Sequence, residues 1–326
     1  MVGICFKMVA EFSSDWAVCG NMFSILWSLM YPRWHIDNNP FPNLYVDLTE
    51  RCNMDCNFCY NPERSRADLG YDYFAEACAR LPAPVNWRFL GGEPTLNDRF
   101  FDLIEIALHH GHTVYFASNG IRFNDPAFME ELAHWSGKVS VGLSMDGGTL
   151  DNRFYTLLNN RDCLGSKLQA LENLHRYGIK RVCLSVIIVR NENERVIGEL
   201  YEAANRYSDV VRYIHYRSAA MVGRWIDTRP YMLEELKRLT RPYFSDEAFT
   251  PHCLREINCN AGDGECCYRF RPNSRLQISL IEFATERSSR CHNRGKLLPE
   301  GLLIEPFFAN MISEGINHSK SDLAPE

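Results

Sequence analysis

Residues 44–59 read LYVDLTERCNMDCNFC, in which a short apolar segment leads directly into three cysteines with the spacing Cys-x3-Cys-x2-Cys. The segment Leu44–Leu48 has the length and apolar content of a buried strand. Cys52, Cys56 and Cys59 follow it, on what we expect to be a tight loop. The chain has 13 cysteines in 326 residues, so this spacing should arise by chance only roughly 0.02 times. The triplet therefore indicates a function.

The strand-like pattern recurs along the chain and alternates with helix-like segments. Its apolar runs are nearly continuous, which is typical of strands buried on both faces. Helix signals such as Asp125-Pro126 lie between the runs. The alternation predicts a parallel sheet in a partial (β/α)6 TIM-like barrel, with its chemistry at the carboxyl ends of the strands. The further expected strands are 87–90, 113–117, 139–143, 182–189 and 210–216.

Three regions are expected along the chain. Residues 1–43 form an N-terminal helical extension, residues 44–228 the partial barrel, and residues 229–326 a small Cys-rich C-terminal cap with a hairpin around 269–285. The apolar segment Trp16–Tyr31 falls short of the ~20 residues of a membrane span. We therefore expect a buried or interfacial helix there and no membrane span, with a membrane-surface anchor as the alternative.

Charge and cysteine usage narrow the setting of the protein. The net charge is −6, the pI is about 6.0, and no long basic run is present, so no nucleic-acid partner is expected. A chain of this size without a secretory signal does not require disulfides. We therefore predict a reducing, cytoplasmic location, in which clustered cysteines bind metal or take part in catalysis.

Three thiolates on one loop match three irons of a cubane cluster. Electron-transfer clusters use four cysteines, so a three-cysteine site leaves one iron open to a ligand, as catalytic zinc sites do. A structural zinc site needs four ligands, and no fourth is obvious nearby. A non-catalytic iron–sulfur or zinc-binding protein is the alternative.

The triplet, with the aromatic Phe58 before its last cysteine, resembles the signature of the radical S-adenosylmethionine (SAM) superfamily. The resemblance implies an enzyme with a [4Fe–4S] cluster on Cys52, Cys56 and Cys59, and with SAM on the open iron. In that family, the cluster cleaves SAM reductively, and the 5′-deoxyadenosyl radical abstracts hydrogen from a substrate. An external electron donor such as flavodoxin or ferredoxin is also implied, and Phe58 is placed beside the adenine. The resemblance does not decide whether the substrate is a peptide or a small molecule. It also does not decide whether the reaction is of the oxidoreductase or the transferase type.

Later strand ends carry further motifs that resemble the family's SAM contacts. The turn Gly91-Gly92-Glu93-Pro94 resembles a Gly-Gly-Glu-Pro motif whose glycines expose backbone groups to the SAM amino group, with Glu93 assisting. Each motif also has a plain interpretation as a turn or as core packing. The other positions that the resemblance implies are Ser118 and Asn119 for the SAM carboxylate or ribose, Ser144 and Asp146 for the ribose, and Val186 with Ile188 for the adenine.

The resemblance covers about residues 44–217, and it is nearest to the branch with the molybdenum-cofactor enzyme and the peptide-modifying enzymes. On the last expected strand, inward members of His215, Tyr216 and Arg217, and also Arg224, are candidates to meet substrate or to serve the structure. No residue is assigned a catalytic role. One auxiliary iron–sulfur cluster is possible on Cys253, Cys259, Cys266 and Cys291, and packed thiols are the alternative.

Overall fold

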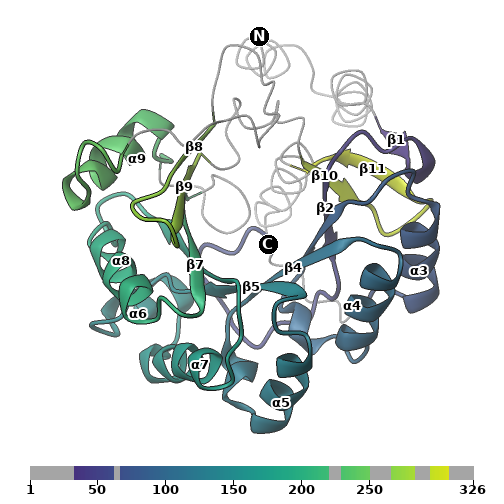
Figure 1. Cartoon of the computed structure of the whole chain (residues 1–326), viewed down its shortest axis with the longest axis horizontal. Helices are drawn as coiled ribbons and strands as arrows, with labels where there is room; N and C mark the ends of the chain where they lie inside the picture. Colours follow the sequence, from purple (N-terminus) through teal and green to yellow (C-terminus); the bar gives the residue numbers. More distant parts are fainter. Residues whose placement is uncertain (1–32, 62–66, 220–228, 250–265, 283–293, 308–326) are drawn as a thin grey trace, which may run out of the picture.

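The computed structural model describes residues 33–61, 67–219, 229–249, 266–282 and 294–307. Within these ranges the strands form an 11-stranded sheet in the order β1-β11-β10-β2-β3-β4-β5-β6-β7-β9-β8. The sheet curves into an open barrel with helices on its outer side (Figure 1). The predicted α/β fold and partial barrel are therefore confirmed.

Six parallel strands make up the centre of the sheet, and all six were expected from the sequence. Each begins and ends within two residues of the predicted bounds. Their order along the chain is also their order in the sheet, as right-handed βα units produce. The strands are β2 (Asn43–Asp47), β3 (Asn86–Leu90), β4 (Thr113–Ser118), β5 (Val139–Ser144), β6 (Val182–Ile188) and β7 (Val211–Ser218).

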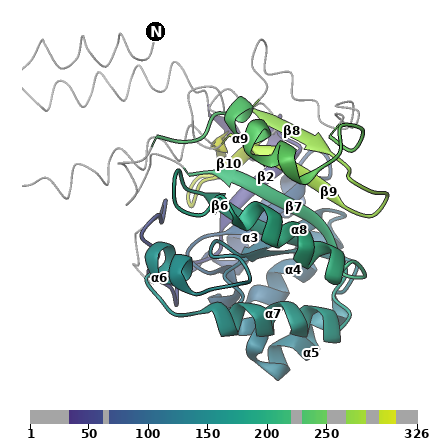
Figure 2. The same cartoon turned by 90° about the vertical axis from the view of Figure 1, so that its left-hand side faces the viewer.

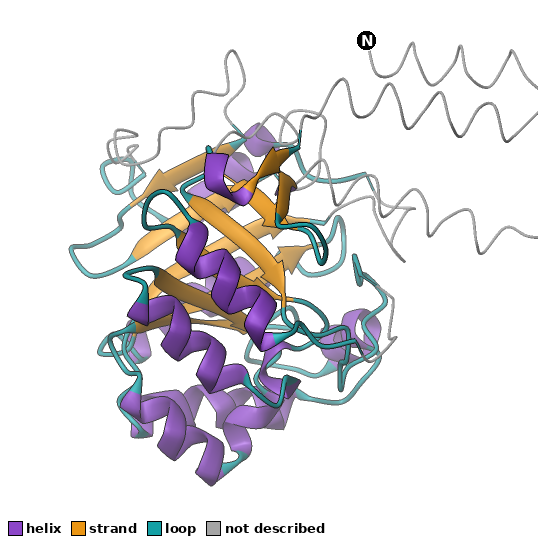
Figure 3. Ribbon diagram, turned by 90° about the vertical axis from the view of Figure 1, so that its right-hand side faces the viewer, coloured by secondary structure: helices purple, strands orange, loops and turns teal. Residues whose placement is uncertain are grey.

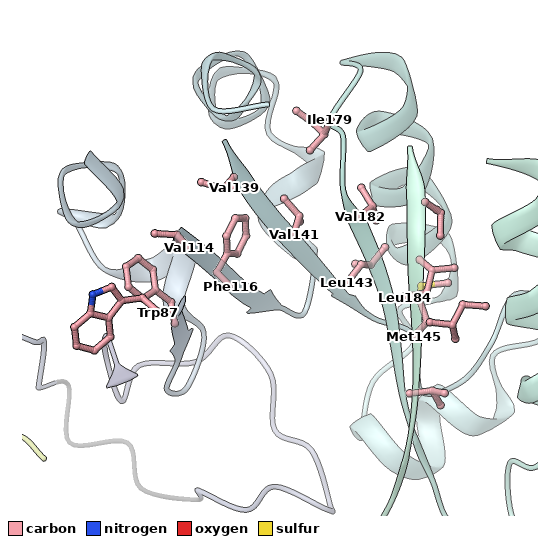
Figure 4. Packing of buried hydrophobic residues seen from close by; sticks show 14 of the residues in the cluster. Trp87, Val114, Phe116, Val139, Val141, Leu143, Met145, Ile179, Val182 and Leu184 are labelled. Atoms are coloured by element: carbon pink, nitrogen blue, oxygen red, sulfur yellow. The ribbon is translucent and has the colours of Figure 1, made fainter. Parts of the chain in front are cut away.

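The two faces of these strands differ, because alternate side chains point to opposite sides of a sheet. On β3, Trp87 and Phe89 are fully buried in the core, whereas Asn86, Arg88 and Leu90 line a cavity inside the barrel. Figure 4 shows Trp87 and its neighbours from other strands on the side that faces the helices. The expectation that the strands are apolar on both faces was wrong for the inner face, which is polar.

Helices cover the outer face and begin at signals of different kinds. Asp125 caps α5 as predicted, because its carboxylate accepts a hydrogen bond from the Ala127 N–H at 3.1 Å. No side-chain hydrogen bond caps α8, and Asn193, which precedes it, donates its amide to the carbonyls of Asp146 (2.9 Å) and Ile187 (2.8 Å). The helices, seen in Figure 3, are α3 (Tyr71–Arg80), α4 (Phe100–His109), α5 (Pro126–His134), α6 (Arg153–Asn159), α7 (Leu164–Arg176) and α8 (Val196–Arg206).

Strands from both ends of the described chain extend the sheet. β9 (Gln277–Ile281) pairs in parallel with β7, and β10 (Arg294–Leu297) pairs in parallel with β2. The hairpin expected near residues 269–285 is present as β8 (Cys267–Phe270) antiparallel to β9. The sheet therefore continues beyond the boundary that we expected at residue 228. The remaining elements are β1 (Trp34–His35), β11 (Leu303–Pro306) and α9 (Leu233–Thr240), which lies beside β8 and β9 (Figure 2).

The segment Trp16–Tyr31 lies outside the described residues. Among the helices that are described, none has both the length and the apolarity to cross a bilayer.

Candidate cofactor site

A cavity of about 370 Å³ opens at the carboxyl ends of the strands and reaches into the barrel. The thiols of Cys52, Cys56 and Cys59 line it together with Phe58. Every position that the sequence suggested for cofactor contact also lines the cavity, with the exception of Val186 and Ile188. These further lining residues are Gly91, Gly92, Glu93, Pro94, Ser118, Asn119, Ser144 and Asp146.

The cysteine loop is held from two sides. The Asn57 N–H donates to the Leu158 carbonyl at 2.9 Å, and the Asn159 amide donates to Cys56 Sγ at 3.2 Å. On the other side, Asn119 Nδ2 donates to Asn53 Oδ1 at 2.7 Å. The end of α6 and the turn after β4 therefore fix where the loop lies. No local pattern indicates that Asn159 contacts the loop, because it lies 103 residues from Cys56 along the chain.

The donor set suits an iron–sulfur cluster. Burial raises the pKa of the Cys56 thiol to about 12, so the thiol is neutral until a metal displaces its proton. Within the described ranges, no group of three or more His, Cys, Asp or Glu side chains is arranged to hold a single metal ion. A cubane takes each cysteine on a different iron, so three thiols around one cavity fit it without converging on one point.

The glycines of the turn after β3 pack against the start of the cysteine loop. The Gly92 N–H donates to the Thr49 carbonyl at 2.7 Å, and the Glu93 N–H donates to the Arg51 carbonyl at 2.8 Å. A Cβ on Gly92 would lie 2.3 Å from the Arg51 oxygen, and Gly91 has a φ of +125°. Glycine is thus required here for close packing of two backbone segments, a reason that we did not anticipate.

Glu93 ties two strand-end turns together. One carboxylate oxygen accepts from the Asn119 N–H at 2.7 Å, and the other accepts from the Thr95 hydroxyl at 2.7 Å. The side chain is only 2 % exposed, and burial raises the pKa of its carboxyl group. Glu93 therefore positions the turns after β3 and β4 beside the cavity.

Lys167 has a similar role one strand further along, and the sequence did not reveal it. The side chain of this α7 residue is buried, and its ammonium donates to the carbonyls of Asn119 and Ser144, each at 2.7 Å. Ser118 Oγ accepts from the Gly120 N–H at 2.9 Å, which is the plain turn interpretation. These bonds leave the shape of the cavity wall well defined.

Asp146 holds the end of β6 against the turn after β5. Its carboxylate accepts from the Ile187 N–H at 3.0 Å, and burial raises the pKa of the group. The neighbouring Val186 is fully buried in the core, whereas Ile187 lines the cavity and packs with Phe58 against one small apolar cluster. Ile188 is likewise fully buried in the core. The choice of Val186 and Ile188 for the adenine was therefore wrong, because adjacent strand residues point to opposite sides of the sheet and Ile187 is the one that faces the cavity.

The candidate substrate contacts on β7 also divide between the face toward the cavity and the face toward the core. His215 and Arg217 line the cavity, whereas Tyr216 is buried on the outer face and its hydroxyl donates to the Ile197 carbonyl at 2.7 Å. Arg224 lies outside the described residues, as do Cys253, Cys259 and Cys291. Cys266 is buried, with its Sγ 3.8 Å from Cys267 Sγ. The auxiliary cluster stays a prediction.

A parallel α/β barrel with a Cys-x3-Cys-x2-Cys loop and a Gly-Gly-Glu-Pro turn around one cavity defines a radical SAM domain. Residues 46–204, just under half of the chain, match the family model described as the Radical SAM superfamily, as the resemblance of the sequence predicted. Enzymes of this superfamily use a [4Fe–4S] cluster and SAM.

Named relatives have diverse activities. The chain is 28% identical over 189 residues to a 7,8-dihydro-6-hydroxymethylpterin dimethyltransferase of Methanocaldococcus jannaschii, which covers 55% of this chain and 36% of the relative. It is 28% identical over 191 residues to the mycofactocin maturase MftC of Mycobacterium tuberculosis, covering 56% and 47%. It is also 26% identical over 178 residues to a GTP 3′,8-cyclase of Synechocystis, covering 52% and 53%. The chain thus spans about a third to a half of the length of these relatives.

The fold resembles that of SuiB from Streptococcus suis, solved with bound S-adenosylmethionine. That likeness has a TM-score of 0.57 at 16% identity and covers 92% of this chain and 68% of the other. The complex of SuiB with its precursor peptide SuiA gives a TM-score of 0.58 at 17% identity, covering 89% and 65%. The predicted likeness to the molybdenum-cofactor and peptide-modifying branch is confirmed, and the non-catalytic alternative has no support.

Proposed function

We propose that Cys52, Cys56 and Cys59 hold the [4Fe–4S] cluster, and that the cavity beside them binds SAM and the substrate. When bound, the cluster would supply one electron for the reductive cleavage of SAM, the chemistry that gives a 5′-deoxyadenosyl radical for hydrogen abstraction from a peptide or small molecule. The observation that supports this proposal is the convergence of the three thiols and the strand-end turns on one cavity.

The strand-end residues would act by positioning. Phe58 and Ile187 offer an apolar wall that suits a planar base. Glu93 and Lys167 brace the turns that face the cluster, so that the polar groups of those turns keep their places. The position of the cavity inside the barrel would limit the access of water to a reactive species.

The proposed substrate is a peptide or a small molecule. The relatives include enzymes named for a pterin, for mycofactocin maturation and for GTP, so sequence similarity does not choose between a peptide and a small molecule. An external reductant such as flavodoxin or ferredoxin would reduce the cluster.

The test is anaerobic reconstitution of the full chain with iron and sulfide, followed by reduction in the presence of SAM. We expect about four irons on the loop cysteines, and formation of 5′-deoxyadenosine. A variant with Cys52, Cys56 and Cys59 all changed to alanine should lose that iron and the product. The matched control is Cys78→Ala, because Cys78 is buried in the core of α3, away from the cavity.

Two results would overturn the proposal. One is an unchanged iron content in the triple variant, which would place the cluster elsewhere. The other is an absence of 5′-deoxyadenosine from the fully loaded, reduced wild-type protein.

A further inference from the structure

The inner wall of the barrel beyond the cysteine loop is strongly basic. Arg88 on β3, Arg217 on β7, Arg269 on β8 and Arg294 on β10 all line the cavity. The acidic residues in the same described lining are Glu93 and Asp146, and both accept backbone N–H groups at strand ends. Guanidinium groups that face one space repel each other, and an anion between them lowers that repulsion.

Three neighbouring residues on this wall carry buried polar atoms without a hydrogen-bond partner in the described structure. These atoms are His215 Nδ1 on β7, Ser279 Oγ on β9 and Arg269 Nε on β8. They belong to one row across the sheet, because His215 pairs with Ser279 and Ser279 pairs with Arg269. Ser279 is 1 % exposed and lies between Gln277 and Ile281, which line the cavity, so it shares their face.

Such a row calls for a ligand, because a buried polar group without a partner is destabilising by about 1–3 kcal/mol. The charge around the row determines which ligand. Burial and the nearby guanidinium groups, Arg217 and Arg88 foremost, lower the pKa of His215 well below its usual value. The imidazole is therefore neutral, and Arg269 supplies a forked cationic donor beside it.

We infer that this row binds an anionic group of the substrate, a carboxylate or a phosphate, with Arg269 as its principal charged contact. The inference rests on the proposed function only in assigning the anion to the substrate of the radical. Arg88 would face the same group from the opposite part of the wall, where its guanidinium now lies 4.5 Å from the centre of the Tyr115 ring. A substrate held in this way would extend from the inner wall toward the cysteine loop.

The test is calorimetric titration of the cluster-loaded full chain, unreduced and saturated with SAM so that the carboxylate of SAM does not compete. Inorganic pyrophosphate is the probe for a phosphate group, and malonate is the probe for a carboxylate. We expect one of the two to bind, which identifies the source of the anion, and Arg269→Gln to weaken it by about tenfold or more. The matched control is Arg275→Gln, an exposed arginine in the turn between β8 and β9, which should bind as wild type does.

Arg88→Gln is a second variant on a different strand, and it should also weaken binding. It provides the test if Arg269→Gln does not fold. Failure of the wild type to bind either probe overturns the inference. Binding that is unchanged in both variants also overturns it, because it indicates an adventitious ion only. Formation of 5′-deoxyadenosine without substrate is measured in parallel, and we expect it to be equal in wild type and the Arg275→Gln control. Its absence would contradict the proposed function while leaving the anion site standing.

Discussion

Gly92→Ala tests how closely the turn after β3 must approach the cysteine loop. The new Cβ would lie 2.3 Å from the Arg51 oxygen, 2.6 Å from the Glu50 oxygen and 2.7 Å from the Arg51 carbonyl carbon. All three are backbone atoms, so no side-chain rotation relieves the overlap. To reach an ordinary contact of 3.4 Å, the two segments must separate by about 1.1 Å.

That separation would break the hydrogen bonds that join the segments. The bonds from the Gly92 and Glu93 N–H groups are 2.7 and 2.8 Å long, and an added ångström takes both beyond hydrogen-bonding distance. Each lost bond leaves partly buried groups unpaired at about 1–3 kcal/mol. We therefore expect Gly92→Ala to lower the free energy of unfolding by about 3 kcal/mol, and to move Cys52 relative to the turn.

The assay is urea unfolding together with iron content after reconstitution. Gly165→Ala is the control, because a Cβ on Gly165 meets nothing within 4 Å, and alanine is favoured in a helix by up to about 1 kcal/mol. A loss of less than about 0.5 kcal/mol in Gly92→Ala, with iron content equal to that of the control, would refute the reasoning.

Three further predictions concern the cavity wall. Asn159→Ala removes the N–H donor to Cys56 Sγ, and it should lower the potential of the cluster by about 40 mV in an EPR redox titration, the equivalent of one hydrogen bond of about 1 kcal/mol. Ile187→Ala should weaken SAM binding several-fold in calorimetry with little change in stability, whereas Val186→Ala should reduce stability by about 2 kcal/mol and leave SAM affinity unchanged. His215 is neutral in the fold but takes up a proton near pH 6.5 on unfolding, so its stabilising contribution falls as the pH drops. Between pH 7 and 5.5 the free energy of unfolding should fall by about 1 kcal/mol from this cause. Urea unfolding at the two pH values should show that His215→Gln loses less stability than wild type by that amount.

The sequence was sufficient for the strands and for the cysteine loop because both depend on local pattern. The segment NWRFL of β3 already alternates, with Arg88 between Trp87 and Phe89, and this is the signal that the barrel is polar inside. In β6 the segment VCLSVII is apolar at nearly every position. Its pattern cannot tell which residues face the cavity, so Val186 was chosen in place of Ile187.

Contacts between residues that are distant along the chain could not be predicted from the sequence. Lys167 reaches the carbonyls of Asn119 and Ser144, which are 48 and 23 residues away. A lysine on an amphipathic helix is ordinarily at the surface. Only the packing of α7 against the strand ends turns this one inward, and no local pattern in the chain encodes that approach.

The separation of the two strand faces has a consequence for how the site can change. The outer face packs Trp87, Phe89 and their neighbours against helices, and this burial supplies most of the favourable free energy of folding. The inner face carries His215, Ser279 and Arg269, whose buried polar atoms reduce stability unless a ligand satisfies them. A substitution of an inner polar residue therefore changes which ligand binds and has little effect on the stability of the core. A substitution of an outer residue leaves the ligand specificity unchanged and lowers the stability of the fold. The cysteine loop and its glycine turn are the exception, because there the packing of the backbone and the chemistry of the site depend on the same few atoms.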